Sequence, residues 1–217
     1  MKIGIISDVH CNLPALLRAL DEMGEVDEIL CAGDMVYEYR FSNPVVDVLR
    51  QRGIKTVLGN HEEVILSQDG QRMRRDGVIS PENLAFLNSL PKVLETRLDG
   101  KRVYMVHGSP WPPEKEYLYP SHPYIPRLAK IDADVVILGH THYPMIRQVG
   151  GVLVINPGSC GEARDPRHDF RLTYAIMDTS TGEAVIRSFV SPDEGRGWGE
   201  ETAPQETEEG EGIYGRE

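Results

Sequence analysis

A chain of 217 residues with 40% apolar and 26% charged residues fits a single globular domain and excludes a fibrous protein or two large lobes. The net charge of -11 and the lack of a basic run exclude a general affinity for nucleic-acid backbones. No apolar stretch approaches the roughly 18 residues of a membrane-spanning helix. The first residues lead into a strand without a secretory signal, so we expect a cytoplasmic protein.

Short apolar runs alternate with segments of helical period through residues 1–190, which is typical of an α/β domain. After a buried strand predicted for residues 2–7, Asn12 offers a helix N-cap, Pro14 suits a first turn, and leucines follow at helical spacing. The same signals predict a strand at residues 28–32, a helix at 42–50, a strand at 54–58, a helix at 81–90 and a strand at 135–138.

Three hairpins are predicted in the second half of the chain, around the turn sequences Asp99-Gly100, Gly150-Gly151 and Ser180-Thr181-Gly182. Their strands are expected at residues 93–98 and 102–106, 143–149 and 152–155, and 172–177 and 184–189. Because hairpin strands are antiparallel, we expect two packed sheets with helices outside and not one doubly wound sheet.

Acidic residues are concentrated at the C-terminal end of the sequence. Residues 191–217 carry nine acids against two arginines, which leaves 21 basic and 25 acidic residues in residues 1–190. The acidic segment has too few apolar residues to offset the entropy of ordering it. We therefore expect one folded domain over residues 1–190 and a disordered, solubilising tail over residues 191–217.

Five predicted strands end in the same way, each followed at once by side chains that can bind a metal ion. These side chains belong to Asp8 and His10, to Asp34, to Asn60, His61 and Glu62, to His107, and to His140 and His142. Ligands of α/β proteins bind beyond the carboxyl ends of the strands, so we expect these groups to converge on one crevice. Five of the seven histidines of the chain lie at these strand ends.

The chemistry of the donors indicates the kind of ion. Carboxylate, amide and imidazole groups suit manganese, iron, zinc or nickel better than calcium. The metal-binding set predicted in this way consists of Asp8, His10, Asp34, Asn60, His107, His140 and His142. Seven ligands are too many for one ion and suit two divalent ions that share a bridging carboxylate. Taken alone, Asp8 or Asp34 fits an ordinary helix cap or turn residue. Buried together without cations, however, each carboxylate would cost several kcal/mol.

The three cysteines, Cys11, Cys31 and Cys160, lack the spacing of a disulfide framework or a zinc finger. Each fits a small buried residue. Cys11 directly follows His10, so a ligand or redox role is the alternative for this cysteine.

The motifs Asp8-x-His10, Gly33-Asp34, Gly59-Asn60-His61-Glu62, His107-Gly108 and Gly139-His140-x-His142 together resemble those of the calcineurin-like metallophosphoesterase family. The resemblance extends to about residue 190 and is greatest to small, single-domain prokaryotic phosphodiesterases and phosphatases. It implies a four-layer αββα sandwich, an α/β fold in which two mixed β-sheets carry helices on both outer faces.

The resemblance also implies the roles of individual side chains. Asp8, His10 and His142 would hold one ion, Asn60, His107 and His140 the other, and Asp34 would bridge them. A metal-bridging hydroxide would attack the phosphorus, and His61 would contact the phosphoryl group and protonate the leaving oxygen. Mn²⁺ is the expected ion, with Fe, Zn or Ni as alternatives.

Other residues near these motifs have more than one interpretation. Glu62 would either orient His61 or complement the dipole of the helix that it opens. Asn12 and Arg164 are candidates for substrate binding, and Arg164 also fits a surface ion pair. The segment from Trp111 to Tyr119 would either wall the pocket and select a base or an aryl group, or pack as an ordered loop.

We therefore expect a dinuclear phosphoesterase that prefers phosphodiesters to phosphomonoesters and acts on a small phosphate ester or a nucleotide. Protein serine/threonine phosphatases follow their Gly-Asp motif with an arginine, whereas here the segment 35–39 lacks one, which weakens that interpretation. A catalytically weak scaffold for protein contacts, as in a retromer subunit of this fold, is the alternative from another class. The complete ligand set and His61 argue against the scaffold. A homo-oligomer is left open.

Overall fold

The computed structural model describes residues 1–112 and 115–192, and their strands form two five-stranded sheets. In spatial order the first sheet holds β10 (Glu183–Phe189), β9 (Leu172–Asp178), β1 (Lys2–Ile6), β2 (Glu28–Cys31) and β3 (Lys55–Thr56). The second holds β4 (Val93–Leu98), β5 (Lys101–Val106), β6 (Val135–Ile137), β8 (Val152–Asn156) and β7 (Met145–Val149). Each sheet combines parallel pairs, such as β1 with β2 and β5 with β6, with antiparallel pairs, such as β9 with β10 and β7 with β8.

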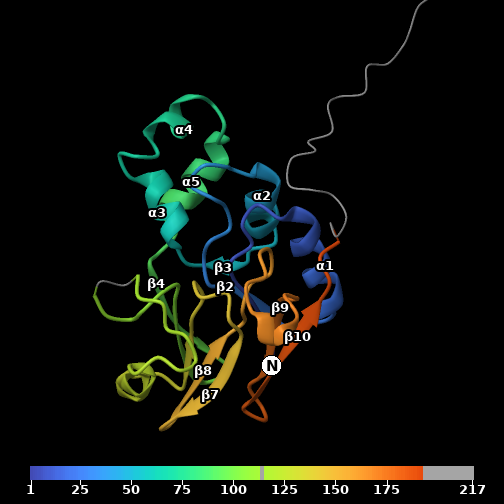
Figure 1. Ribbon diagram of the computed structural model, residues 1–217, viewed down its shortest axis with the longest axis vertical. Helices are drawn as coiled ribbons and strands as arrows, with labels where there is room; N and C mark the ends of the chain where they lie inside the picture. The colour runs from blue at the N-terminus through green and yellow to red at the C-terminus, as the bar shows by residue number, and fades with distance from the viewer. Residues whose placement is uncertain (113–114, 193–217) are drawn as a thin grey trace, which may run out of the picture.

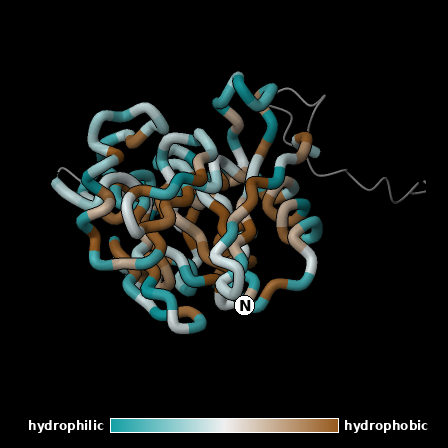
Figure 2. Tube along the Cα trace, turned by 90° about the horizontal axis from the view of Figure 1, so that it is seen from below, coloured by the Kyte–Doolittle hydropathy of each residue, from teal (hydrophilic) through white to brown (hydrophobic). Residues whose placement is uncertain are grey.

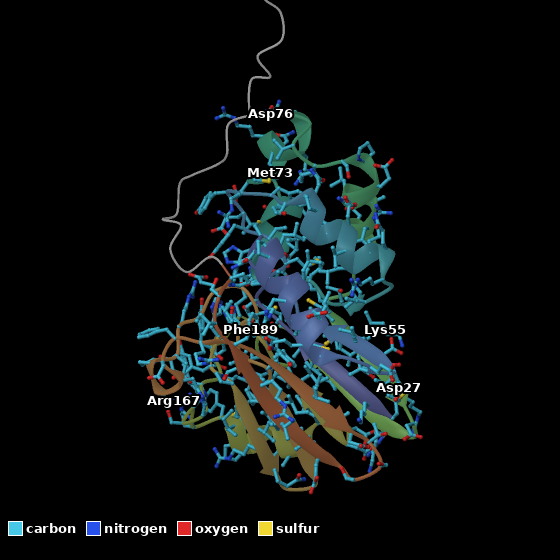
Figure 3. The ribbon with its side chains drawn as sticks, turned by 90° about the vertical axis from the view of Figure 1, so that its right-hand side faces the viewer. Asp27, Lys55, Met73, Asp76, Arg167 and Phe189 are labelled. Atoms are coloured by element: carbon cyan, nitrogen blue, oxygen red, sulfur yellow. The ribbon has the colours of Figure 1, made fainter. Side chains whose placement is uncertain are left out.

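Helices connect these strands in the described part of the chain. They are α1 (Leu13–Met23), α2 (Asn43–Gln51), α3 (Asn60–Leu66), α4 (Gln71–Arg75), α5 (Pro81–Ser89) and the 3₁₀ helices η1 (Ile125–Lys130) and η2 (Pro166–His168). Figure 1 shows α3, α4 and α5 gathered at one end of the molecule, at the top of the view, with β7 and β8 toward the other end. Met73 and Asp76 mark the same helical end in Figure 3.

Capping residues determine where three of the helices begin. Asn12, Ser42 and Ser80 each accept a hydrogen bond from the backbone N–H three residues further on, at the starts of α1, α2 and α5. A proline lies in the first turn of each of these helices, where its missing N–H leaves no hydrogen bond unmade. α1 ends at Gly24, whose φ of 64° lies in the left-handed region that favours glycine.

The two sheets pack face to face over a buried apolar layer. Ile3 and Ile5 of β1 belong to this layer together with Met105 of β5 and Ile137 of β6. Ile6 faces the opposite way and packs in the cluster that contains α1, because successive side chains of a strand point to opposite faces. Figure 2 shows the hydrophobic segments inside the molecule and hydrophilic ones along its periphery.

The outer faces of the sheets carry different layers. α1 and α2 cover the first sheet, where Leu16 and Leu49 pack in one cluster with Tyr174 of β9. The second sheet is covered by η1, whose Ile125 and Leu128 pack in one cluster with sheet residues. This layer is a short 3₁₀ helix because prolines recur through the segment before and within it, at Pro120, Pro123 and Pro126, and deny an α-helix its N–H groups.

The predicted sandwich of two mixed sheets with outer helices is confirmed, and so are the three hairpins. The strand predicted at residues 54–58 is reduced to β3, an edge strand of two residues. The helix expected to open at Glu62 is present as α3, although its length was not predicted. Helix α4 was not predicted, since it lies in a polar stretch and has no buried residue. The predicted disordered tail lies almost entirely outside the described residues, so it and the boundary near residue 190 stay predictions. No helix among the described residues is long and apolar enough to cross a membrane.

Leu16→Ala is expected to lower the free energy of unfolding by about 2–5 kcal/mol, because it leaves a cavity between α1 and the first sheet. Leu17→Ala is the matched control, since Leu17 lies in the same helix and is 43% exposed. We expect it to change the free energy of unfolding by about 0.5 kcal/mol or less. Urea denaturation with an unchanged m-value measures both, and equal losses in the two variants would contradict the packing described above.

Candidate metal centre

The structure brings together the side chains of all seven residues in the predicted metal-binding set. They follow the carboxyl ends of β1, β2, β3, β5 and β6, where the loops of the two sheets meet. Among the described residues, three overlapping groups of side chains could hold a metal ion. These groups are Asp8 with His10 and His142, Asp34 with His107 and His140, and Asp34 with His10 and His61.

The first group is formed by the loops after β1 and β6. His142 Nε2 lies 3.2 Å from Asp8 Oδ1, and His10 Nε2 lies 3.8 Å from the same oxygen. The two Nε2 atoms are 3.0 Å apart. All three side chains are at most 3% exposed, so their donor atoms converge on one buried point.

The second group lies beside the first. His107 Nε2 is 3.0 Å from Asp34 Oδ2, 3.1 Å from His140 Nδ1 and 3.2 Å from Asn60 Oδ1. The third group links the other two, because it shares Asp34 with the second and His10 with the first. The arrangement therefore offers two adjacent cation positions with Asp34 between them.

These donors fit divalent cations. Asp8 Oδ1 is buried and, within the described residues, has no hydrogen-bond partner. Although burial alone would lower the pKa of His107, the carboxylate of Asp34 raises that pKa to about 10. A buried carboxylate that so strongly favours a proton on the neighbouring imidazole would also attract a divalent ion, which can replace that proton as the compensating charge.

The ring nitrogens that face away from the cluster are held by backbone carbonyls. His107 Nδ1 lies 2.7 Å from Ala32 O, His142 Nδ1 lies 2.7 Å from the backbone oxygen of Glu162, and His140 Nε2 lies 3.2 Å from that of Lys115. A nitrogen that donates to a carbonyl leaves the other ring nitrogen with a lone pair. Such hydrogen bonds orient metal-ligating histidines in proteins.

The backbone of the site is held in the left-handed region at five residues of the metal-binding set. Their φ angles are 55° at Asp8, 49° at His10, 53° at Asp34, 69° at His140 and 58° at His142. Residues with side chains avoid this region, and such strain is concentrated at functional sites. Gly59 permits the tight approach of two loops, because a Cβ there would overlap Asp34 Oδ1.

Glu62 ties the loops after β2 and β3 together. Its Oε2 accepts hydrogen bonds from Asp34 N at 2.9 Å and from Gly59 N at 2.8 Å, and its Oε1 accepts one from Val36 N at 3.1 Å. Burial and the nearby charge of Asp34 raise the pKa of Glu62 to about 7. Its side chain thus positions the backbone of Asp34 and caps α3, which agrees with the helix-end interpretation.

The carboxylate beside the His61 ring is that of Glu38, a residue that the sequence analysis did not single out. Glu38 Oε2 contacts His61 Nδ1, while His61 Nε2 points toward Asp34 Oδ2 at 3.7 Å. The available signal was an acid shortly after Gly33-Asp34, but no periodicity linked it to His61. His61 therefore has one ring nitrogen on a carboxylate and the other directed at the centre.

A second missed residue, Tyr37, lies beside the first group. Its ring stacks on that of His10, with centroids 4.4 Å apart, and its hydroxyl donates to Glu162 Oε2 at 2.6 Å. Arg164 also donates to Glu162 Oε2, at 2.8 Å, so the predicted surface ion pair is present. Binding of a substrate phosphate by Arg164 stays a prediction.

Asn12 and Cys11 have partners within the protein. Asn12 caps α1 through Ala15 N and donates to Gly161 O at 3.0 Å, so its role in substrate binding also stays a prediction. Cys11 Sγ donates to Arg40 O at 3.1 Å, and burial raises the pKa of its thiol. Cys11 belongs to none of the metal-binding groups found among the described residues.

A cavity of about 140 Å³ opens beside the second group. Its lining includes Asn60 and His140 of the metal-binding set together with Lys92 and Lys115. Glu63 pairs with both lysines, at 2.8 Å and 3.1 Å. The cavity gives part of a ligand access to the second cation position.

The chain is similar to known proteins in sequence and in fold. The calcineurin-like phosphoesterase superfamily domain matches residues 1–182. An uncharacterized protein of Methanocaldococcus jannaschii is 32% identical over 204 residues, which cover 81% of this chain and 82% of the relative. A phosphodiesterase of the same organism is 27% identical over 167 residues, covering 74% and 84% of the two chains. The crystal structure of a metallophosphoesterase from Sphaerobacter thermophilus superposes with a TM-score of 0.73 at 29% identity, covering 88% and 89%.

Glu62→Gln is expected to lower the free energy of unfolding by about 1–3 kcal/mol, because an amide NH₂ would face a buried backbone N–H. Glu63→Gln is the matched control, since Glu63 is the next residue and its ion-pair partners are lysines that are 56% and 60% exposed. That change should cost about 1 kcal/mol or less. Urea denaturation of both variants measures the difference, and equal stabilities would show that the Glu62 hydrogen bonds are dispensable.

Proposed function

This chain belongs to the calcineurin-like phosphoesterase superfamily and is a hydrolase acting on phosphate esters, and we propose that it works with two divalent metal ions and prefers phosphodiesters. The observation that carries the proposal is that two side-chain groups, one around Asp8 and one around Asp34, are linked by a third group in which Asp34 lies with His10 and His61. One ion would not use all of these donors. Two ions would use Asp34 as their common ligand.

Within this proposal the two ions are held by different loops. Asp8, His10 and His142 hold one ion, Asn60, His107 and His140 hold the other, and Asp34 bridges them. When bound, such a pair of ions supplies a water of lowered pKa and neutralises charge on the phosphoryl oxygens. The donor set suits Mn²⁺, with Fe, Zn or Ni as alternatives.

His61 is the proposed proton donor to the leaving oxygen. Burial lowers the pKa of His61, and the charge of Asp34, toward which its Nε2 points, opposes that shift. Its Nδ1 contacts the carboxylate of Glu38, which holds the orientation of the ring and, as a neighbouring negative charge, would favour its protonated form. His61 N also donates to Asp34 Oδ1 at 3.1 Å, which links the ring to the metal-binding set. Glu38 is thereby a positioning residue and His61 the catalytic acid.

The preference for diesters is supported by the relatives named phosphodiesterases, from Methanocaldococcus jannaschii and Escherichia coli. The phosphate oxygens of a diester carry one negative charge, whereas those of a monoester carry up to two. Hydrolysis of phosphomonoesters of nucleotides or proteins is the neighbouring possibility.

Location in the cytoplasm and self-association stay predictions from the sequence.

Protein from which a chelator has removed the metal is expected to bind two Mn²⁺ ions per chain and to recover its activity. The recovered protein should hydrolyse the diester bis-p-nitrophenyl phosphate faster than the monoester p-nitrophenyl phosphate. Asp34→Asn should lower both metal content and hydrolysis, because it removes the carboxylate that belongs to two of the three groups. Asp47→Asn, on the surface of α2, is the matched control. Calorimetry and elemental analysis count the ions. Tight binding of one ion only would contradict the dinuclear site, and metal-loaded protein inactive on both esters would favour a scaffold.

His61→Ala is expected to lower kcat by about 10²–10⁴-fold, because it removes the proton donor, while metal content stays unchanged. Glu38→Gln should lower kcat less and move the alkaline limb of the pH–rate profile to lower pH, since the lost negative charge favoured protonated His61. His168→Ala, on an exposed histidine outside the site, is the control. An unmoved alkaline limb in Glu38→Gln would remove Glu38 from the mechanism.

A further inference from the structure

A row of tyrosines leads away from the candidate metal centre. We call the rings of Tyr117, Tyr119 and Tyr143 the aromatic row. Tyr117 stacks on His140, with ring centroids 3.8 Å apart and planes at 25°. Tyr119 is nearly parallel to Tyr117, at 6.0 Å and 13°, and meets Tyr143 edge to face at 5.0 Å. The row is therefore continuous with a residue of the metal-binding set.

The residue between the first two rings anchors the row. Leu118 is 3% exposed and belongs to the apolar cluster on the outer face of the second sheet. Tyr117 and Tyr119 on either side of it are 43% and 39% exposed. Backbone hydrogen bonds from Tyr119 N to Tyr117 O and from His122 N to Tyr119 O shape the turn. Two neighbouring aromatic rings are thus presented to solvent beside the site, which indicates a ligand surface.

Guanidinium groups border the row. Arg167 lies over the Tyr143 ring, 5.0 Å from its centroid, and Arg147 donates to Pro120 O, next to Tyr119 in the chain. Arg167 also pairs with Asp165 at 2.7 Å. Figure 3 shows Arg167 at the periphery of the molecule, far from the α4 end. Exposed aromatic faces beside arginines are the features with which proteins hold the bases of single-stranded nucleic acids.

We propose that the aromatic row binds the base of a nucleoside phosphodiester whose phosphorus lies at the candidate metal centre. This inference rests on the proposed function and names its substrate class, namely diesters in which at least one alcohol is a nucleoside. Stacking accepts every base because each has a π-face, so the row selects nucleosides without selecting one base.

The order of the rings favours a nucleoside over a simple aryl ester. In an aryl ester the ring is bonded directly to a phosphate oxygen, whereas in a nucleotide a pentose separates base from phosphate. Tyr117 lies against His140, and Tyr119 lies one ring further out. A ring bonded to the phosphate oxygen reaches Tyr117 alone, and a base beyond a pentose reaches Tyr119. The two classes therefore differ in their dependence on Tyr119.

Two esters with the same leaving group test the proposal on the full-length, manganese-loaded protein: thymidine 5′-(p-nitrophenyl phosphate) and methyl p-nitrophenyl phosphate. The ratio of their kcat/KM values should fall about fivefold or more in Tyr119→Leu, because the base loses its stacking partner. Tyr119→Phe keeps the ring and should keep the ratio. Tyr124→Leu, which removes a tyrosine 42% exposed outside the row, is the matched control.

Calorimetric titration with thymidine 5′-phosphate and with methyl phosphate gives the same comparison without turnover. The wild type should bind the thymidine ester more tightly, and Tyr119→Leu should lose that preference by about fivefold or more. Preferences that are equal in the wild type and Tyr119→Leu would overturn the nucleoside site even where both esters are hydrolysed. A Tyr119-dependent preference in binding with no hydrolysis of either ester would support the nucleoside site and overturn the proposed function.

Discussion

Two carboxylates buried side by side are the constraint around which the carboxyl ends of the strands are organised. Asp8 and Asp34 are 0% and 2% exposed. Burial and the charge of Asp8 oppose ionisation of Asp34, yet His107 holds the pKa of Asp34 below its usual value. Charges of one sign at this depth require compensation of several kcal/mol, and imidazoles alone supply it only by binding protons. The histidines are therefore part of what makes the buried acids tolerable, and a divalent cation would replace their protons.

The strained loops that carry these acids are held by hydrogen bonds between the two sheets. The backbone oxygen of Asp8, after β1, accepts from Ser159 Oγ at 2.7 Å and from Gly161 N at 3.1 Å, both after β8. His140 N, after β6, donates to Asp8 Oδ2 at 3.1 Å. Each bond joins a loop of the first sheet to a loop of the second. Such cross-links offset the cost of left-handed backbone at five residues, so the site and the packing of the sheets stabilise each other.

The parts of the site that follow from strand ends could be predicted from the sequence, because a buried apolar run determines where a strand stops and which residue comes next. Asp34 and His107 were found in this way. The contact of Glu38 with His61 could not be predicted, since it joins the loop after β2 to the first turn of α3, and α2 and β3 lie between them in the chain. Glu62 was recognised as a helix-opening residue, but its bond to Asp34 N depends on how closely the loops after β2 and β3 approach. Local sequence patterns thus predict which side chains could bind a metal ion, but they do not predict contacts between segments that are distant in the sequence.

The side chains that would bind the metal ions differ in burial from those that would select the substrate. Donors such as His142 are buried and oriented by backbone carbonyls, so a substitution among them would expose uncompensated charge. Tyr117 and Tyr119 of the aromatic row are exposed and flank the buried Leu118, so these two rings could be exchanged at little cost in stability. Residues that can change without unfolding the domain are the ones through which one metal centre can be adapted to different esters. The exposed tyrosines therefore carry more information on the substrate than the metal-binding set does.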